Sequence, residues 1–110
     1  MNARILICCL IALGCGPDTA ALRAQLAKQE HTVARAQAEY AGARARWKEM
    51  QDSLQIKIRQ NQALGMDENQ ARAVEEALLE SHRTTVKAAE QNLKHQRAYL
   101  NQLKQVLGSP

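Results

Sequence analysis

Apolar and small side chains recur along the first half of the chain at alternating steps of four and three residues. This track also passes through the polar residues Gln29, Lys57 and Asn61. Its apolar members are Leu22, Leu26, Val33, Ala36, Tyr40, Ala43, Trp47, Met50, Leu54 and Leu64. Such spacing, sustained over about six heptads, is typical of a coiled-coil helix. With Gly16-Pro17 as a break before it, the pattern predicts a first helix over about residues 19–64.

Signals for a helix end and a helix start stand close together in the middle of the chain. Gly65 suits the left-handed position just past a helix, with Met66 packing back on the last turn. Asp67 is a good N-cap, and Gln70 three residues later completes a pattern like a capping box. We therefore predict a turn over Gly65, Met66 and Asp67 and a second helix over about residues 68–107. A single bent helix that tolerates Gly65 is the alternative.

The second helix carries an apolar track of its own. It runs through Ala71, Val74, Leu78, His82, Val86, Ala89, Leu93, Gln96, Leu100, Leu103 and Leu107. Folding the chain back at the turn matches the two tracks layer by layer, with Gln29 facing Leu103. Ala36 then faces Gln96, in a polar layer that can help to fix the register. The predicted fold is all-α, a long antiparallel two-helix hairpin. Alanine in the seam favours self-association into a bundle, or docking on a partner.

Composition agrees with long helices and argues against an enclosed catalytic pocket. Aromatic residues make up 3% of the chain, Phe is missing, and charged residues make up 24%. This mixture is typical of coiled coils and offers few large side chains for a thick core. The net charge of +4 is too small to indicate nucleic acid by itself.

Charge is unevenly distributed along the second helix. Between Asp67 and Glu80 there are five acidic residues and one base, Arg72. From Ser81 onward there are five bases and one acid, Glu90. The bases are Arg83, Lys87, Lys94, Arg97 and Lys104. This order fits the helix macrodipole, and it also fits a binding surface.

The amino terminus has the form of a secretory signal peptide. Arg4 supplies a positive charge, and residues 5–13 are an unbroken run of nine apolar residues. Nine helical residues span about 14 Å, roughly half of the hydrocarbon core of a bilayer. The run is therefore too short to cross a membrane and is interpreted as the apolar part of a leader.

The end of this leader resembles the lipobox of bacterial lipoproteins. The residues concerned are Ala12, Leu13, Gly14 and Cys15. Gly14 and Cys15 match the two most restrictive positions, whereas Ala12 stands where Leu is commonest. The resemblance implies cleavage before Cys15, a diacylglycerol on its sulfur and an acyl chain on its new amine, with no other cofactor. An ordinary cleaved signal, or an apolar start on a cytosolic coiled coil, is the alternative.

The resemblance sets the expected organisation of the chain. Residues 1–14 are the signal peptide, 15–20 the lipidated cysteine and tether, 21–107 the hairpin and 108–110 a tail. Gly16, rather than Asp, after the cysteine implies sorting to an outer membrane, facing the periplasm, if the host is Gram-negative. The mature chain keeps one cysteine and can form no internal disulfide.

Two groups of residues are candidate contacts. Ile56 and Ile58 lie off the seam near the turn and suggest a partner-binding site, although Ile58 also fits a flanking core position. The hairpin is expected to bring basic residues together at its membrane end, where they contact anionic head groups. These residues are Arg23, Lys28, Lys94, Arg97 and Lys104.

Residues for catalysis or metal binding are not recognisable. His31, His82 and His95 lack metal-ligand spacing, and Ser81 lies on a different helix face from its neighbour His82. The sequence also has no glycine-rich phosphate loop. It predicts neither an enzyme, nor a metal site, nor a small-molecule substrate.

The predicted function is that of a lipid-anchored structural or interaction protein of the cell envelope, bound to itself or to another envelope protein. Secretion, conjugation or entry exclusion, efflux and envelope-spanning assemblies are the settings considered. The heptads resemble the major outer-membrane lipoprotein, but Gly108-Ser109-Pro110 replaces its C-terminal Lys. The hairpin is similar to those of efflux adaptors, whose Arg-Leu-Ser tip pattern is missing.

The alternative is a soluble basic coiled coil that binds nucleic acid or a partner coiled coil in the cytoplasm. Nucleic-acid binding predicts clustered bases interleaved with aromatic residues. In this chain acids alternate with the bases, and Trp47, Tyr40 and Tyr99 lie on or beside the seam. We therefore expect no nucleic-acid partner.

Overall fold

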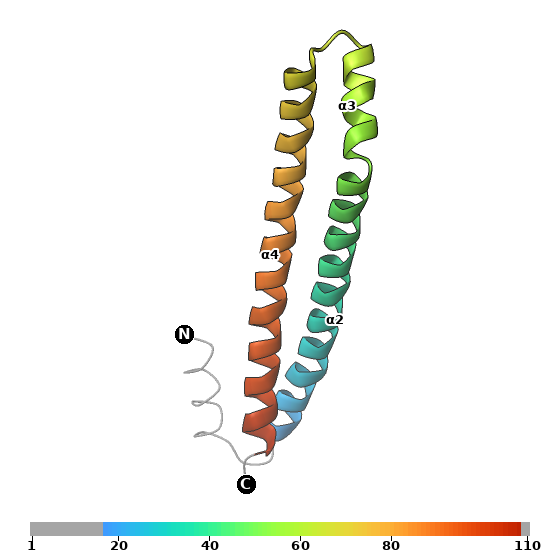
Figure 1. The fold of residues 1–110 in the computed structure, drawn as a ribbon. Coiled ribbons are helices and arrows are strands. Elements are labelled where there is room, and N and C mark those ends of the chain that lie inside the picture. Colours follow the sequence, from blue (N-terminus) through green and yellow to red (C-terminus); the bar gives the residue numbers. More distant parts are fainter. Residues whose placement is uncertain (1–16, 109–110) are drawn as a thin grey trace. The chain divides into compact units, whose positions relative to one another are not determined.

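The computed structural model describes residues 17–108, which form three α-helices and no strand. Helix α2 spans Pro17–Asp52, α3 spans Leu54–Ala63 and α4 spans Glu68–Gly108 (Figure 1). The all-α prediction is confirmed for this part of the chain. Ala12, Leu13, Gly14 and Cys15, which carry the predicted lipobox, lie outside the described residues.

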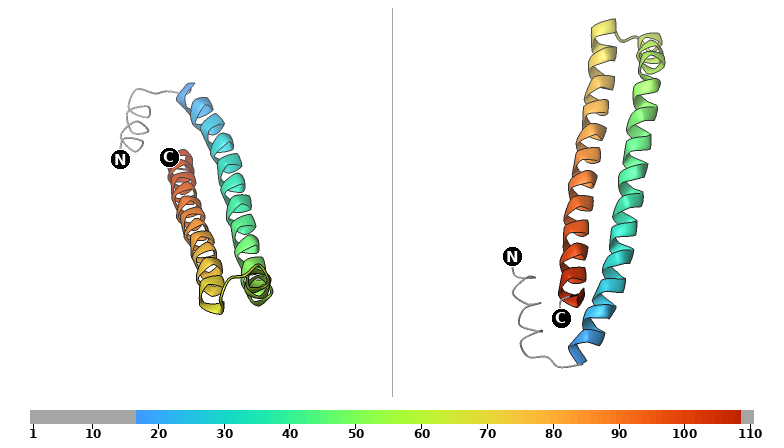
Figure 2. Two further views of the ribbon diagram at one scale, coloured as in Figure 1. Left: turned by 90° about the horizontal axis from the view of Figure 1, so that it is seen from above. Right: turned by 60° about the horizontal axis from the view of Figure 1, so that its bottom comes forward.

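The described chain divides into two compact units. The terminal unit combines residues 17–34 of α2 with residues 95–108 of α4. The central unit is Arg35–Lys94 and contains the rest of α2, all of α3 and the start of α4. Within the central unit, α3 and the first turns of α4 lie side by side in every view (Figure 2).

Helix α2 begins two residues earlier than predicted, at Pro17. Proline suits the first position of a helix because its fixed φ is already helical and its missing N–H is not needed there. The residue that was expected to break a helix therefore starts one.

A break at Ser53 divides the predicted first helix into α2 and α3. The Ser53 hydroxyl donates to the carbonyl oxygen of Glu49 at 2.9 Å, and its backbone N–H donates to the same oxygen at 3.0 Å. Such back-bonding by serine often bends a helix. The N–H of Lys57 still donates to the Ser53 carbonyl at 3.0 Å, so backbone bonding continues across the break.

The buried face of α2 and the buried face of α3 point to different sides of the helix axis, because the spacing of buried residues changes at this break. Before it, every seventh residue is buried, at Leu22, Gln29, Ala36 and Ala43. After it, the buried residue is Ile58, at 2% exposure, instead of the predicted Lys57. From the break onward, the inward-facing residues are spaced by four, four and three residues and no longer follow the heptad. This new spacing is close to the period of an undistorted helix. The predictions of Lys57 and Leu64 in the seam are wrong.

The start of α4 also departs from the predicted track. Val74 and Leu78 are 42% and 47% exposed, whereas Glu75 is buried and Leu79 is half-buried. Glu75 and Leu79 are the positions reached by counting sevens backward along the buried face of α4. The sequence analysis placed Val74 and Leu78 on the buried face because they are apolar, and this placement is wrong.

The terminal unit has a core of large side chains. Leu22 and Leu103 are buried against each other, and Leu26, Tyr99, Val106 and Leu107 pack around them. The Gln29 side-chain amide donates to the Gln96 carbonyl oxygen at 2.9 Å and to the Gln96 Oε1 at 2.8 Å. Gln29 therefore bonds Gln96, whereas the predicted register pairs Gln29 with Leu103.

The central unit has a core of smaller side chains. Its buried apolar residues are Ala36, Ala43, Ile58, Ala71, Val86 and Leu93. The same unit contains a polar contact between its helices, in which the Tyr40 hydroxyl donates to Glu90 at 3.4 Å. Alanine fills half of this core and buries little apolar area per residue.

Candidate interaction surface

The turn between α3 and α4 is built by a glycine and an aspartate. Gly65 has φ +102°, a left-handed conformation that a side chain would strain. The N–H of Met66 donates to the Asn61 carbonyl at 3.2 Å, and that of Gly65 donates to the Gln62 carbonyl at 3.0 Å. This pair of bonds is a Schellman motif, and it satisfies carbonyls at the end of α3.

The aspartate of the turn starts α4. Asp67 Oδ1 accepts a hydrogen bond from the backbone N–H of Gln70 at 2.8 Å, as an N-cap does. The Asp67 carbonyl also accepts from the N–H of Ala71 at 2.9 Å. Gly65 and Asp67 thus have the backbone roles in the turn that the sequence predicts for them. Met66 itself is exposed.

The exposed large apolar side chains of the described chain are concentrated near this turn. All of them belong to the central unit, and they are Ile56, Leu64, Met66, Val74 and Leu78. Ile56 is 58% exposed, which keeps it available as a partner contact. Ile58 is in the core, so its alternative role as a flanking core residue is the one observed. Grouped exposed apolar residues are typical of a binding surface.

A buried polar pair joins α3 and α4 close to the turn. Asn61 Nδ2 donates to Glu75 Oε1 at 2.9 Å, and Glu75 is buried. The bond joins α3 to α4 within the central unit. A buried carboxylate needs such a donor because it has left water. The pair therefore ties the two helices together close to the turn.

Charged residues of α4 form ion pairs along the helix. Arg72 lies 3.8 Å from Glu68 and 3.9 Å from Glu76, and Lys94 lies 3.2 Å from Glu90. These exposed pairs contribute little to stability. The paired charges lie on sides of α4 other than the side that carries Val74 and Leu78. The spacing of the charged residues along the sequence could have predicted this separation.

The predicted basic residues belong to two units. Arg23, Lys28, Arg97 and Lys104 are exposed side chains of the terminal unit, whereas Lys94 belongs to the central unit. A hollow of about 230 Å³ in the terminal unit includes Lys28 beside Gln29 and Tyr99. Contact of these bases with lipid head groups stays a prediction.

Trp47 is the one polar side chain of the described residues with a buried atom that lacks a hydrogen-bond partner, its Nε1. Trp47 also borders a hollow of about 500 Å³ lined entirely by α2, including Arg44, Lys48 and Asp52. The Arg44 guanidinium lies 5.6 Å from the centre of the Tyr40 ring. A hollow with walls from one helix encloses a ligand poorly.

Within residues 17–108, no three histidine, cysteine or acidic side chains come together as a metal site. None of the described helices combines the length and the apolar character needed to cross a bilayer. No protein-family model, curated protein or solved structure matches this chain.

Proposed function

We propose that this chain is the precursor of a lipid-anchored protein of the bacterial cell envelope that works by binding another protein. The observation that carries the proposal is the order of Arg4, nine apolar residues and then Gly14-Cys15. Cleavage before Cys15 removes the leader, and two or more acyl chains on that residue give stable membrane binding. Gly16 favours the outer membrane of a Gram-negative host.

The anchored part is a helical hairpin with the character of an antiparallel coiled coil. Three hydrogen bonds support this arrangement, and each of them joins α2 or α3 to α4. Asn61 bonds Glu75, Tyr40 bonds Glu90 and Gln29 bonds Gln96, so the partners are 14, 50 and 67 residues apart. A separation that grows with distance from the turn is what an antiparallel pair requires.

The hairpin presents its binding surface close to the turn, where the exposed apolar residues gather. Because α2 begins at Pro17, the helix starts two residues after the lipidated cysteine. The lipid thus holds one end of the hairpin at the membrane surface. The protein is a structural or interaction module, and its own covalent chemistry is confined to Cys15.

The test is the intact mass of the protein from the membrane fraction. We expect the mass of residues 15–110 plus a triacyl increment. Cys15→Ser should retain the leader and lose the lipid, and Cys9→Ser is the matched control that should be processed normally. A full-length, unmodified mass for the unsubstituted chain would refute the anchor and favour a soluble coiled coil.

A further inference from the structure

The hollow of the terminal unit has the chemistry of an anion site. Its volume is about 230 Å³. Its lining residues are Gln25, Lys28, Gln29, Thr32 and Tyr99. We propose that this hollow binds a phosphate group, carried by a lipid head group or free in solution. The proposal goes beyond the protein-binding role of the chain and does not depend on the lipid anchor.

The lining residues come from two helices of one compact unit. Residues 25, 28, 29 and 32 follow steps of three, one and three, which keep them on one side of α2. Tyr99 supplies the wall from α4. Both segments belong to the terminal unit, so the hollow lies within a single packed part of the chain.

Two of the lining residues are held in place from behind. Gln29 is 7% exposed, and its amide donates to Gln96 at 2.9 and 2.8 Å. Tyr99 packs against the core of Leu22 and Leu103. A tyrosine that is fixed by its ring can still offer its hydroxyl to a polar partner. The hollow therefore has a fixed wall from each helix.

Three hydrogen-bond donors of the lining have no partner. The Lys28 ammonium, the Gln25 amide and the Tyr99 hydroxyl bond to no group that the structure describes. By contrast, the Thr32 hydroxyl donates to the Lys28 carbonyl at 3.1 Å, and the Gln29 amide is used by Gln96. The lining thus offers one full positive charge and two neutral donors to a ligand.

The positive charge of Lys28 has no acid beside it. Glu30 is the one acidic residue of segments 19–34 and 95–108. It follows Lys28 by two residues, which turns it about 200° away around the helix. An anion in the hollow would therefore meet a lysine without meeting a carboxylate.

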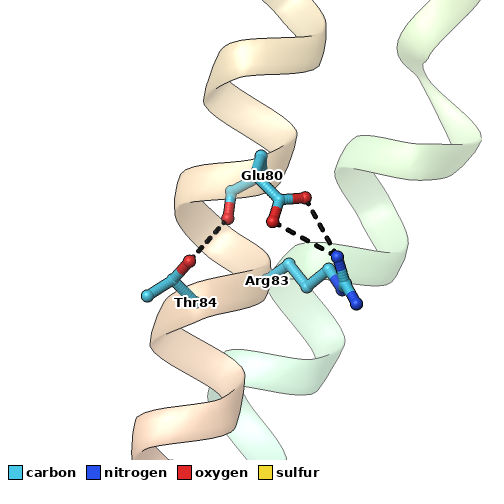
Figure 3. A network of polar contacts seen from close by, with 3 residues as sticks. All are labelled: Glu80, Arg83 and Thr84. Carbon is cyan, nitrogen blue, oxygen red and sulfur yellow. Dashed lines mark hydrogen bonds and ion pairs between the residues drawn. The ribbon is translucent and has the colours of Figure 1, made fainter.

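A base of the central unit shows the contrast. Arg83 Nη1 lies 3.2 and 3.3 Å from the two carboxylate oxygens of Glu80, as Figure 3 shows. This pair offsets part of the arginine charge within the chain itself. Lys28 forms no such pair with the described side chains, so its ammonium is available to an external anion.

The donor set fits phosphate better than carboxylate. Lysine binds phosphate as a point charge, and three separate donors can each bond a different oxygen of a tetrahedral anion. A carboxylate has two oxygens in one plane, and the arginine fork that matches them is absent from the lining. The hollow is therefore assigned to a phosphate group.

Two sources of phosphate are compatible with the place of the hollow. Lys28 follows Pro17 by eleven residues, which is about 16 Å along a helix. With the anchor of the proposed function, lipid phosphates lie near the start of α2. They reach the hollow when the terminal unit tilts toward the bilayer, whereas free phosphate reaches it in any orientation.

The first test is a titration with inorganic phosphate at constant ionic strength. It uses the full chain with its three cysteines replaced by serine, which excludes lipid and disulfides. NMR signals of the amides in residues 25–32 and of Tyr99 should shift and saturate. Lys28→Gln and Tyr99→Phe should each weaken binding about tenfold, because each removes a hydrogen bond to a charged group. The matched control Lys104→Gln removes a base of the same unit outside the lining and should leave binding unchanged.

Three results would overturn the phosphate site. Equal losses in Lys28→Gln and Lys104→Gln would mean that phosphate responds only to the general charge of the unit. Unchanged binding by Tyr99→Phe, or shifts that do not saturate, would be equally decisive. Circular dichroism should show native helix in every variant, since Lys28 and Lys104 are exposed and Tyr99→Phe keeps the packed ring.

The second test separates the two sources. The same variants are sedimented with phosphatidylglycerol vesicles, and the apolar leader common to all of them cancels in the comparison. A larger loss of vesicle binding in Lys28→Gln than in Lys104→Gln supports the site and assigns it to a lipid phosphate. Equal losses on vesicles, with the titration still selective for Lys28, support the site and assign it to free phosphate. Indifference to Lys28→Gln in both assays would overturn it, and no result here bears on the mass test of Cys15.

Discussion

The two units of the described chain place their large apolar residues differently. The terminal unit buries Leu22 and Leu103 within a cluster of leucines and a tyrosine. The central unit fills half of its core with alanine and leaves larger apolar residues, such as Val74 and Leu78, on its surface. Because apolar burial is the main favourable term in folding, a buried leucine of the terminal core contributes more than a buried alanine of the central core.

This difference separates a region that buries its large apolar residues from a region that leaves several of them exposed. The central unit leaves large apolar side chains exposed to solvent. Its core also contains a carboxylate, Glu75, held by Asn61. Both features are costly for the folded chain.

The largest predicted effect is at the centre of the terminal core. Leu103 has 0% exposure, so Leu103→Ala should lower the free energy of unfolding by about 2–5 kcal/mol. Urea unfolding followed by circular dichroism measures the loss. Hydrogen exchange should place the lost amide protection in residues 17–34 and 95–108. The partly buried Val106→Ala is the control and should cost less; equal losses would contradict a core centred on Leu103.

Sequence could predict the helices because their signals are local. The heptad from Leu22 to Met50, the Gly65 turn and the Asp67 cap all depend on neighbours a few residues away. The change of phase at Ser53 was not predictable in this way, since it depends on which face of α3 meets α4. Val74 and Leu78 were wrongly placed in the core, because the sequence does not distinguish an exposed apolar residue from a buried one.

The candidate site was predictable in part for the same reason. Ile56 was identified because it lies off the seam, and Ile58 was paired with it although the phase shift buries it. The contact of Gln29 with Gln96 was missed because constant spacing leaves the register between two heptad tracks undecided. A one-heptad change preserves the apolar pattern and alters only the partners.

The second prediction tests the buried polar pair of the central unit. Asn61→Ala removes the donor to Glu75 and should cost about 1–3 kcal/mol, because the carboxylate stays buried with one bond fewer. Replacing both residues with leucine should restore most of that stability, since apolar pairs of similar shape are often neutral substitutes. Urea unfolding of both variants provides the comparison. If the double variant were the less stable of the two, Glu75 would be stabilising in itself.

The smallest effects come from two glycines of the central unit and should have opposite signs. A Cβ at Gly65 would meet no atom within 4 Å, so Gly65→Ala should cost about 1–2 kcal/mol through its positive φ alone. A Cβ at Gly42 would lie 3.5 Å from Arg46 Nη1, an ordinary contact with a flexible side chain. Gly42→Ala should therefore stabilise the helix by about 0.5–1 kcal/mol. Thermal unfolding of the two variants measures the difference. Stabilisation by Gly65→Ala would mean that α3 and α4 join without the left-handed turn, which would remove the basis for placing the exposed apolar residues at a hairpin end.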